Sequence, residues 1–162
     1  MITIDPEAYV SRMADIEDSI SGTLIEIGAG SRIDSFVKIK PAGGAGDVII
    51  GRSTYINSGV VIYSGNGVRI GSNVLIAANC TLAPVNHQFR ERARLIVEQR
   101  FQPSRGGIRI EDDVWIGANS VILDGAYIRK GSVVGAGSIV RGELPEYSIC
   151  TGAPARPRGY RE

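Results

Sequence analysis

Aliphatic residues recur at every sixth position along most of this chain, and the pattern is clearest between residues 110 and 140. It is made by Ile110, Ile116, Ile122, Ile128, Val134 and Val140. Six is neither the 3.6-residue period of a helix nor the two-residue period of a simple strand. It is the period of the hexapeptide repeats that form parallel β-helices. The pattern therefore predicts a solenoid built from short strands.

The six-residue pattern covers residues 27–145 with three interruptions. It pauses at the Pro- and Gly-rich segment 40–47 and shifts by two residues at Gly65-Asn66-Gly67. The third interruption, residues 88–107, contains five arginines and no repeat. A loop of this length is uncommon in a compact domain and is usually functional. We expect an extended loop to leave the solenoid at residues 88–107.

The neighbours of each repeated aliphatic residue indicate how the solenoid turns. The position after it is often Gly or Ala, and the position two before it is often small. Both features fit three short strands per turn of 18 residues, with aliphatic side chains on the axis and small residues at the corners. Successive turns would then pair at the strand spacing of about 4.8 Å. An all-β sandwich would instead show two-residue alternation with regular turn signals.

The N-terminal segment, residues 1–26, lacks the regular repeat and is expected to cap the open end of the solenoid. Asp5-Pro6-Glu7 looks like the start of a short helix, with an N-cap, a proline at the first helical position and an early acid. Val10, Met13 and Ala14 would then share one face of that helix.

The repeat is expected to end at Leu144-Pro145, leaving residues 146–162 as a polar tail. Residues 1–162 are therefore predicted to be one all-β domain, in agreement with the length of the chain.

Composition excludes several classes of function. The chain has 18 Lys and Arg against 17 Asp and Glu, so it lacks the basic excess of a nucleic-acid-binding protein. Its two cysteines are too few for a disulfide framework, and no apolar run is long enough to span a membrane. The N-terminus lacks the features of a signal peptide. We expect a soluble cytoplasmic protein.

His87 is the only histidine, and it stands where the repeat stops and the loop begins. A histidine is the natural general base for an alcohol or amine. A lone histidine is as often a surface or packing residue, so position alone does not decide between these roles. One histidine and two distant cysteines also disfavour a metal site, which usually needs three or more ligands.

The other chemically interesting residues have structural interpretations. Cys80 lies seven residues before His87, but it occupies a slot where this sequence places small residues, so we expect packing rather than nucleophilic catalysis. Asp124 and the pair Asp112-Asp113 are expected to be solvated turn residues. Trp115 precedes an inward Ile116 and should point outwards, where it would contact a subunit or a ligand.

Several motifs, in this order, resemble those of the hexapeptide-repeat O-acetyltransferases, in particular the galactoside, maltose, nodulation-factor and polysaccharide enzymes. The resemblance covers about residues 50–156. The matching segments are Asn86-His87, the irregular loop, Ile110-Glu111-Asp112-Asp113-Val114-Trp115-Ile116-Gly117-Ala118, Gly135-Ala136-Gly137-Ser138-Ile139-Val140 and Gly152-Ala153-Pro154-Ala155-Arg156.

The resemblance implies a left-handed parallel β-helix, a homotrimer with active sites between subunits, and acetyl-CoA as the donor in a ternary complex without a required metal. His87 matches the catalytic base, and Asn57 matches an asparagine that contacts the acceptor, with Asn86 beside the base. The residues that match the acetyl-CoA-binding wall and its phosphate contacts are Trp115, Ala118, Ala136, Arg156 and Arg158.

The sequence departs from the family in three places. Arg141-Gly142 replaces a frequent Thr-Lys pair, the helical N-terminal extension of the maltose enzymes is short or absent, and the loop 88–107 has its own Arg-rich sequence. In this family the loop reads the shape of the acceptor, so the acceptor does not follow from the resemblance.

Four functions therefore stay open. The leading one is acetyl transfer to a sugar hydroxyl of a glycan or glycoconjugate precursor, as in polysaccharide biosynthesis. The others are a sugar-nucleotide N-acetyltransferase, an antibiotic acetyltransferase, and a non-catalytic β-helix that serves as an assembly subunit.

Overall fold

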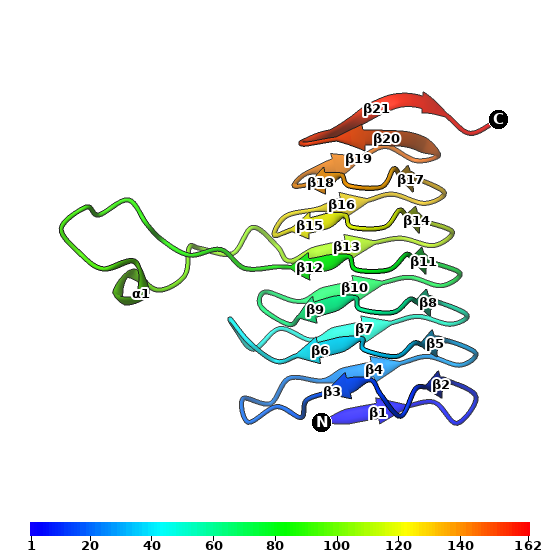
Figure 1. The fold of residues 1–162 in the computed structure, drawn as a ribbon, viewed down its shortest axis with the longest axis horizontal. Coiled ribbons are helices and arrows are strands. Elements are labelled where there is room, and N and C mark those ends of the chain that lie inside the picture. Colours follow the sequence, from blue (N-terminus) through cyan, green and yellow to red (C-terminus); the bar gives the residue numbers. More distant parts are fainter.

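The computed structural model describes residues 1–162 and shows a parallel β-helix, as the six-residue pattern predicts (Figure 1). The chain winds upwards in turns, and each complete turn contributes one strand to each of three parallel sheets. The solenoid is the left-handed β-helix expected from the resemblance.

The strands are short, and those of one sheet lie directly above one another. The first sheet contains β1 (Ile2–Ile4), β4 (Ile25–Ile27), β7 (Val48–Ile50), β10 (Val68–Ile70), β13 (Ile108–Ile110), β16 (Tyr127–Ile128) and β19 (Glu143–Leu144). The second contains β2 (Tyr9–Val10), β5 (Arg32–Ile33), β8 (Tyr55–Ile56), β11 (Leu75–Ile76), β14 (Trp115–Ile116), β17 (Val133–Val134), β20 (Ser148–Gly152) and β21 (Ala155–Tyr160). The third contains β3 (Asp15–Ile16), β6 (Lys38–Lys40), β9 (Val61–Tyr63), β12 (Thr81–Ala83), β15 (Val121–Leu123) and β18 (Ile139–Val140).

The repeated aliphatic residues form columns inside the solenoid. On the second sheet, for example, Ile76 pairs in register with Ile56 below and Ile116 above, and all three side chains are buried. The residues beside them point outwards, so Leu75 and Trp115 are exposed. Because a strand alternates its faces, the six-residue period places one aliphatic side chain of every strand on the axis. Together, 28 buried hydrophobic residues form one core.

The corners also repeat. From residue 28 onwards, the third residue of every corner between the first and second sheets, and between the second and third, has a left-handed backbone with positive φ. Only glycine, and to a lesser extent asparagine and aspartate, adopt this conformation readily. The residues that adopt it at these corners are Gly30, Phe36, Ser53, Gly59, Asn73, Asn79, Asp113, Asn119, Gly131, Gly137 and Tyr147.

Gly51 shows why small residues follow the buried aliphatic position. A Cβ atom added at Gly51 would lie 2.6 Å from the backbone carbonyl of Gly71 on the next turn. Real Cβ atoms essentially never approach backbone so closely. The glycine therefore permits the close stacking of successive corners.

The predicted N-terminal helix is wrong, because residues 2–16 form the three strands of a first turn. Asp5-Pro6-Glu7 makes the corner after β1, and the Glu7 amide donates a 2.9 Å hydrogen bond to Asp5 Oδ1. Parallel pairing with the next turn satisfies the backbone along this segment, whereas an isolated short helix is only marginally stable. The partly buried Ile2, Val10 and Ile16 pack against the core, so the segment still caps this end of the solenoid.

The predicted end of the repeat at Leu144-Pro145 is also wrong. β20 continues the parallel pairing by adding to β17, and β21 then folds back along β20 as an antiparallel strand. Cys150 and Ala155 from this hairpin are buried in the core. The segment that was expected to be a polar tail therefore covers the second end of the solenoid.

Residues 88–107 leave the solenoid between β12 and β13, as predicted, and project far from it (Figure 1). We call this segment the arm. It contains the only helix, α1 (Ile96–Gln99), and no helix of the structure is long and apolar enough to cross a membrane.

Replacement of one axial side chain should destabilise the solenoid far more than replacement of its outward neighbour. We expect Ile122→Ala, which empties a fully buried position on β15, to lower the free energy of unfolding by about 2–5 kcal/mol. Val121→Ala on the outer face of the same strand should cost less than about 1 kcal/mol. Denaturant unfolding at one protein concentration compares the two variants, and equal losses would contradict the axial packing.

Candidate functional site

His87 lies at the base of the arm, on the corner between the third and first sheets. Its backbone forms an antiparallel bridge with Phe101, so the outgoing and returning limbs of the arm are joined here. The imidazole contacts the Phe101 ring at a tilt of 46°, with the two ring centroids 4.7 Å apart. The side chain is exposed, and neither ring nitrogen hydrogen-bonds to another group of the chain. Both nitrogens are therefore available to a ligand.

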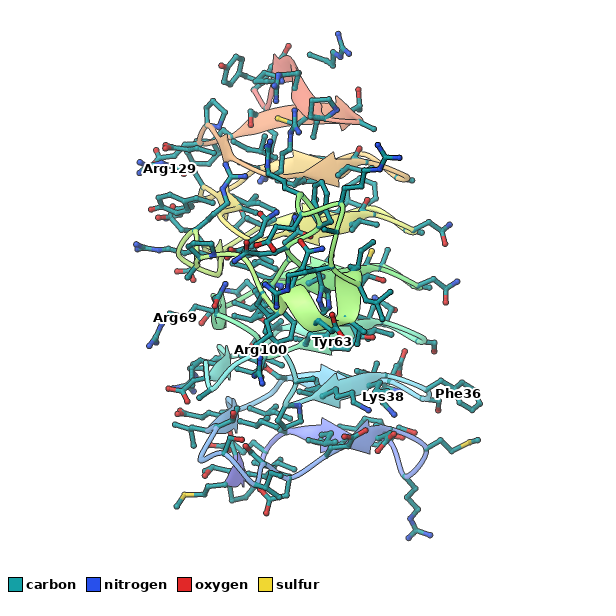
Figure 2. All side chains as sticks on the ribbon, turned by 90° about the vertical axis from the view of Figure 1, so that its left-hand side faces the viewer. Phe36, Lys38, Tyr63, Arg69, Arg100 and Arg129 are labelled. Carbon is teal, nitrogen blue, oxygen red and sulfur yellow. The ribbon has the colours of Figure 1, made fainter.

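His87 borders an apolar cavity of about 330 Å³, which we call the His87 cavity. Tyr63 and Ala83 contribute the solenoid wall, and Phe101 contributes the arm. Figure 2 views this side of the molecule with the arm towards the reader and Tyr63 on the wall. The complete lining is Ala42, Gly43, Tyr63, Ala83, Val85, His87 and Phe101.

The glycine-rich segment before β7 also serves this cavity. Gly43 has a positive φ of 82°, and a Cβ atom there would lie 2.8 Å from Val85 Cγ1. A side chain at residue 43 would therefore collide with the cavity wall. The interruption of the repeat at residues 40–47 thus helps to form the space beside His87.

A second cavity of about 200 Å³, which we call the arginine cavity, adjoins the first through their shared residue Val85. Asn86 lines it, and Asn86 also holds the arm, since its backbone carbonyl accepts a 2.7 Å hydrogen bond from the Gln102 amide. The complete lining is Val85, Asn86, Arg105, Leu123, Asp124 and Arg141.

Asp124 fastens the returning limb of the arm to the solenoid. Its Oδ1 accepts a 2.9 Å hydrogen bond from the buried Gly107 amide, and its Oδ2 accepts bonds from the Arg105 amide at 2.8 Å and from Asn66 Nδ2 at 3.1 Å. The carboxylate is 6% exposed, so the expectation of a solvated turn residue is wrong. Asp124 and Gly107 are 17 residues apart, so no local sequence pattern predicts this contact.

The arm is braced internally by Gln99, at the end of α1. Its side-chain amide nitrogen donates to the carbonyl groups of Glu91 and Arg94 at 2.9 and 3.0 Å, and its oxygen accepts from the Glu91 amide at 3.1 Å. Gln99 is buried, whereas Leu95, Ile96 and Val97 beside it are exposed. The arm therefore has a defined conformation with an apolar tip.

The residues expected to contact the acceptor and donor lie mostly away from His87. Asn57, Ala118 and Ala136 occupy the corners between the second and third sheets, so the width of the third sheet separates them from the arm. In Figure 2, Phe36 marks the same edge at the right of the view. Asn57 Nδ2 donates a 2.8 Å hydrogen bond to the Ile76 carbonyl of the next turn. Asn57 and His87 of one protomer therefore do not form a common site.

Trp115 points outwards, as predicted, and is 52% exposed on β14 between Leu75 and Val133 of the neighbouring strands. Arg156 and Arg158 lie on β21 and are both exposed. Arg156 donates a hydrogen bond to the carbonyl of Ala155, its own neighbour.

Cys80 packs in the core, as predicted. It is fully buried, and its Sγ lies 3.2 Å from the Gly117 carbonyl oxygen. Burial raises the pKa of the Cys80 thiol, which keeps it protonated and a poor nucleophile. No group of three or more His, Cys, Asp and Glu side chains is arranged to hold a metal ion.

Comparisons with known proteins agree with the fold. Residues 107–142 match the family described as bacterial transferase hexapeptide (six repeats). Over 110 residues the chain is 39% identical to the galactoside O-acetyltransferase of Escherichia coli K12. The matched region covers 68% of this chain and 52% of that protein. The chain thus spans about half the length of this relative.

Two solved structures are also similar. A hexapeptide-repeat-containing acetyltransferase of Vibrio cholerae, complexed with acetyl coenzyme A, is 34% identical, with a TM-score of 0.71 over 83% of this chain and 69% of that one. A mutant of the N-acyltransferase AntD of Bacillus cereus, complexed with dTDP-4-amino-4,6-dideoxyglucose and coenzyme A, is 27% identical, with a TM-score of 0.83 over 99% of this chain and 84% of that one.

Loss of the Asp124 carboxylate should loosen the base of the arm. We expect Asp124→Ala to lower the free energy of unfolding by about 1–3 kcal/mol, because it leaves the buried Gly107 amide without an acceptor. Trypsin should then cleave faster at the arginines of the arm. Glu146→Ala removes an exposed carboxylate from another corner and should change neither property. An arm that stays equally resistant in Asp124→Ala would contradict the anchoring role.

Proposed function

Because the chain belongs to the hexapeptide-repeat acetyltransferases, we propose that it transfers an acetyl group from acetyl-CoA to a sugar hydroxyl of a glycan or glycoconjugate precursor. The observation that supports this most is the position of His87. The only histidine of the chain lines an apolar cavity at the base of the arm, and a second cavity with charged walls shares Val85 with it.

His87 is the general base in this proposal. A free imidazole nitrogen accepts the proton of the acceptor hydroxyl, and the hydroxyl oxygen attacks the thioester carbonyl carbon of acetyl-CoA. The carbon–sulfur bond then breaks, and the CoA thiolate leaves and takes up a proton. Donor and acceptor are bound together, so no acetyl group is attached to the enzyme. Phe101 positions the imidazole through the ring contact.

The donor lies along the edge of the solenoid where the second and third sheets meet, which we call the donor edge. Ala118 and Ala136 stand on successive turns at this edge, where their small side chains leave space for a pantetheine arm. Trp115 supplies an exposed apolar surface beside them. Arg156 and Arg158 extend from the C-terminal hairpin and bind the CoA phosphates.

A homotrimer completes the site. The donor edge and His87 lie on opposite edges of the third sheet, so one protomer cannot bring them together. In a trimer, the His87 of one subunit faces the donor edge of its neighbour. That edge carries Asn57, Ala118 and Ala136. The exposed Leu95, Ile96 and Val97 at the tip of the arm would be covered by that contact. Asn57, like Asn86 beside the base, then contacts the acceptor.

N-acetylation is a second candidate. It is supported by the similarity of almost the whole chain to AntD, an N-acyltransferase crystallised with an amino sugar nucleotide. The same base serves an amine, so paired acceptors that differ only in a hydroxyl or an amino group separate the two reactions.

Removal of the proposed base should abolish transfer. We expect His87→Ala to lower kcat by about 10²- to 10⁴-fold, the usual contribution of a general base. The measurement is thiol release from acetyl-CoA with a panel of sugars and amino sugars. Arg69→Ala, at an exposed position of β10 on the first sheet whose side chain makes no hydrogen bond or ion pair, is the control and should retain full activity. Undiminished turnover in His87→Ala would refute the assigned base, and failure to bind CoA would favour a non-catalytic assembly subunit.

The intersubunit site predicts complementation between two inactive variants. Ala118→Phe should block the donor edge and His87→Ala should remove the base, so each homotrimer is inactive. Trimers reassembled from both chains would contain some interfaces with an intact His87 facing an intact Ala118, and activity should return to a measurable fraction of the native rate. Light scattering checks that the protein is trimeric. A monomer, or mixed trimers without activity, would argue against this site.

A further inference from the structure

The donor edge changes character at the level of Asn57. The three corners above Asn57 carry no side chain larger than asparagine; they are residues 77–80, 117–120 and 135–138. The two corners below it carry the exposed Met13 and Phe36 at their third position. Asp34 begins the same corner as Phe36, so an acid and an aromatic ring stand on one corner below Asn57. We call residues 34–37 the Phe36 corner.

Phe36 occupies its position at a conformational cost. Its backbone has a left-handed φ of 63°, which is unfavourable for a bulky residue. Packing does not offset this cost, because the ring is 63% exposed and points away from the solenoid (Figure 2). The other left-handed residues of the donor edge are Gly59, Asn79, Asn119 and Gly137. Strained residues of this kind cluster at ligand sites, so Phe36 is a candidate ligand contact.

The side of Phe36 that faces Asn57 is open. In the column of third corner positions, the next residue above Phe36 is Gly59, which has no side chain. The two corners are joined by backbone alone here, since the Gly59 amide donates a 3.3 Å hydrogen bond to the Ser35 carbonyl. No side chain of this column therefore separates the ring from the corner that carries Asn57.

The proposed trimer brings Phe36 to the lower wall of a neighbouring His87 cavity. Phe36 precedes β6 and the segment 41–47 follows it, so both lie at the level of this strand. Three-fold symmetry about an axis parallel to the solenoid then places the segment 41–47 of one subunit level with Phe36 of its neighbour. Ala42 and Gly43 of this segment line the His87 cavity. The cavity of one subunit is therefore continued downwards by the Phe36 corner of the next.

Phe36 lies too far below the base to contact the reacting sugar. His87 follows β12, and β6, β9 and β12 are successive strands of the third sheet. Two strand spacings put Phe36 about 10 Å below the level of His87. This separation exceeds one pyranose ring and fits the next sugar residue of a chain.

We propose that the Phe36 corner is a second sugar subsite, so that the acceptor is an oligosaccharide chain rather than a single sugar. This inference rests on the proposed acetyl transfer at His87 and on the trimer. The reacting sugar occupies the His87 cavity, and the C–H groups on one face of the next sugar stack on the electron-rich face of the Phe36 ring. Asp34 Oδ1 is 3.3 Å from Arg32 Nε, whereas Oδ2 makes no hydrogen bond within the chain and accepts one from a sugar hydroxyl.

The test compares acceptors that differ only in chain length, in steady-state kinetics. The series are glucose, maltose and maltotriose, and N-acetylglucosamine, chitobiose and chitotriose. The native enzyme should show a kcat/KM at least tenfold higher for the disaccharide than for the monosaccharide of a productive series. Phe36→Gly should remove this preference by raising the KM for the disaccharide about tenfold, with the KM for the monosaccharide and for acetyl-CoA changed less than twofold. Phe36→Trp should retain the preference.

Tyr147→Gly is the matched control. Tyr147 is also an exposed aromatic residue at a left-handed corner position, with φ of 55°, but it lies between the first and second sheets. This variant should keep the native chain-length preference. Phe36→Gly should remain trimeric by light scattering and unfold at no lower denaturant concentration than the native protein, because glycine relieves the backbone strain.

Two results would overturn the inference. One is an equal kcat/KM for monosaccharides and longer chains in the native enzyme. The other is a Phe36→Gly protein that loses its trimer, or loses activity equally with short and long acceptors, which would assign Phe36 to a subunit contact.

Direct binding separates failure of the subsite from failure of the proposed reaction. If no acceptor is acetylated at all, the proposed function is wrong, whereas saturation-transfer NMR with maltotriose and chitotriose still tests the subsite. Transfer to the sugar protons that Phe36→Gly abolishes and Tyr147→Gly preserves supports the subsite. Transfer that is absent from the native protein, or unchanged in Phe36→Gly, refutes it.

Discussion

The in-register stacking of one aliphatic side chain per strand is the constraint on which the rest of the molecule depends. Each inward residue must lie above its equivalent in the previous turn, as Ile56, Ile76 and Ile116 do. A one-residue slip would turn this whole column outwards, because strand faces alternate. Parallel pairing between turns then provides hydrogen-bond partners for the backbone N–H and C=O groups of the strands. The wall that results is regular.

The candidate site lies where a corner is free to change length. Corners between the first and second sheets, and between the second and third, are mostly four residues long and, from residue 28 onwards, have a left-handed residue at the third position. Corners between the third and first sheets do not share this rule, and they range from the short segment 141–142 to the long segment 84–107. Because their ends only have to return to the next turn, insertions there do not disturb the core. The His87 cavity and the arginine cavity both lie at this edge.

The arm is an ordered extension of this edge. Gln99 fixes its tip, the His87–Phe101 bridge joins its limbs, and Asp124 holds its returning limb to the solenoid. These three contacts use backbone groups that would otherwise be unpaired. The same contacts set the walls of the two cavities, so the anchoring of the arm and the shape of the candidate site are coupled.

The sequence by itself determined the solenoid, the outward position of Trp115, the packing of Cys80 and the place where the arm leaves. These follow from local periodicity and from its interruption. Only the tertiary structure decided the fate of the two ends, because residues 2–16 and 148–160 become strands through pairing with neighbouring turns, against their local signals. The tertiary structure also decided which residues meet at the corners between the third and first sheets. Asn66, Arg105 and Asp124 are far apart in the chain, and their contacts depend on the stacking of turns, which a one-dimensional pattern does not contain.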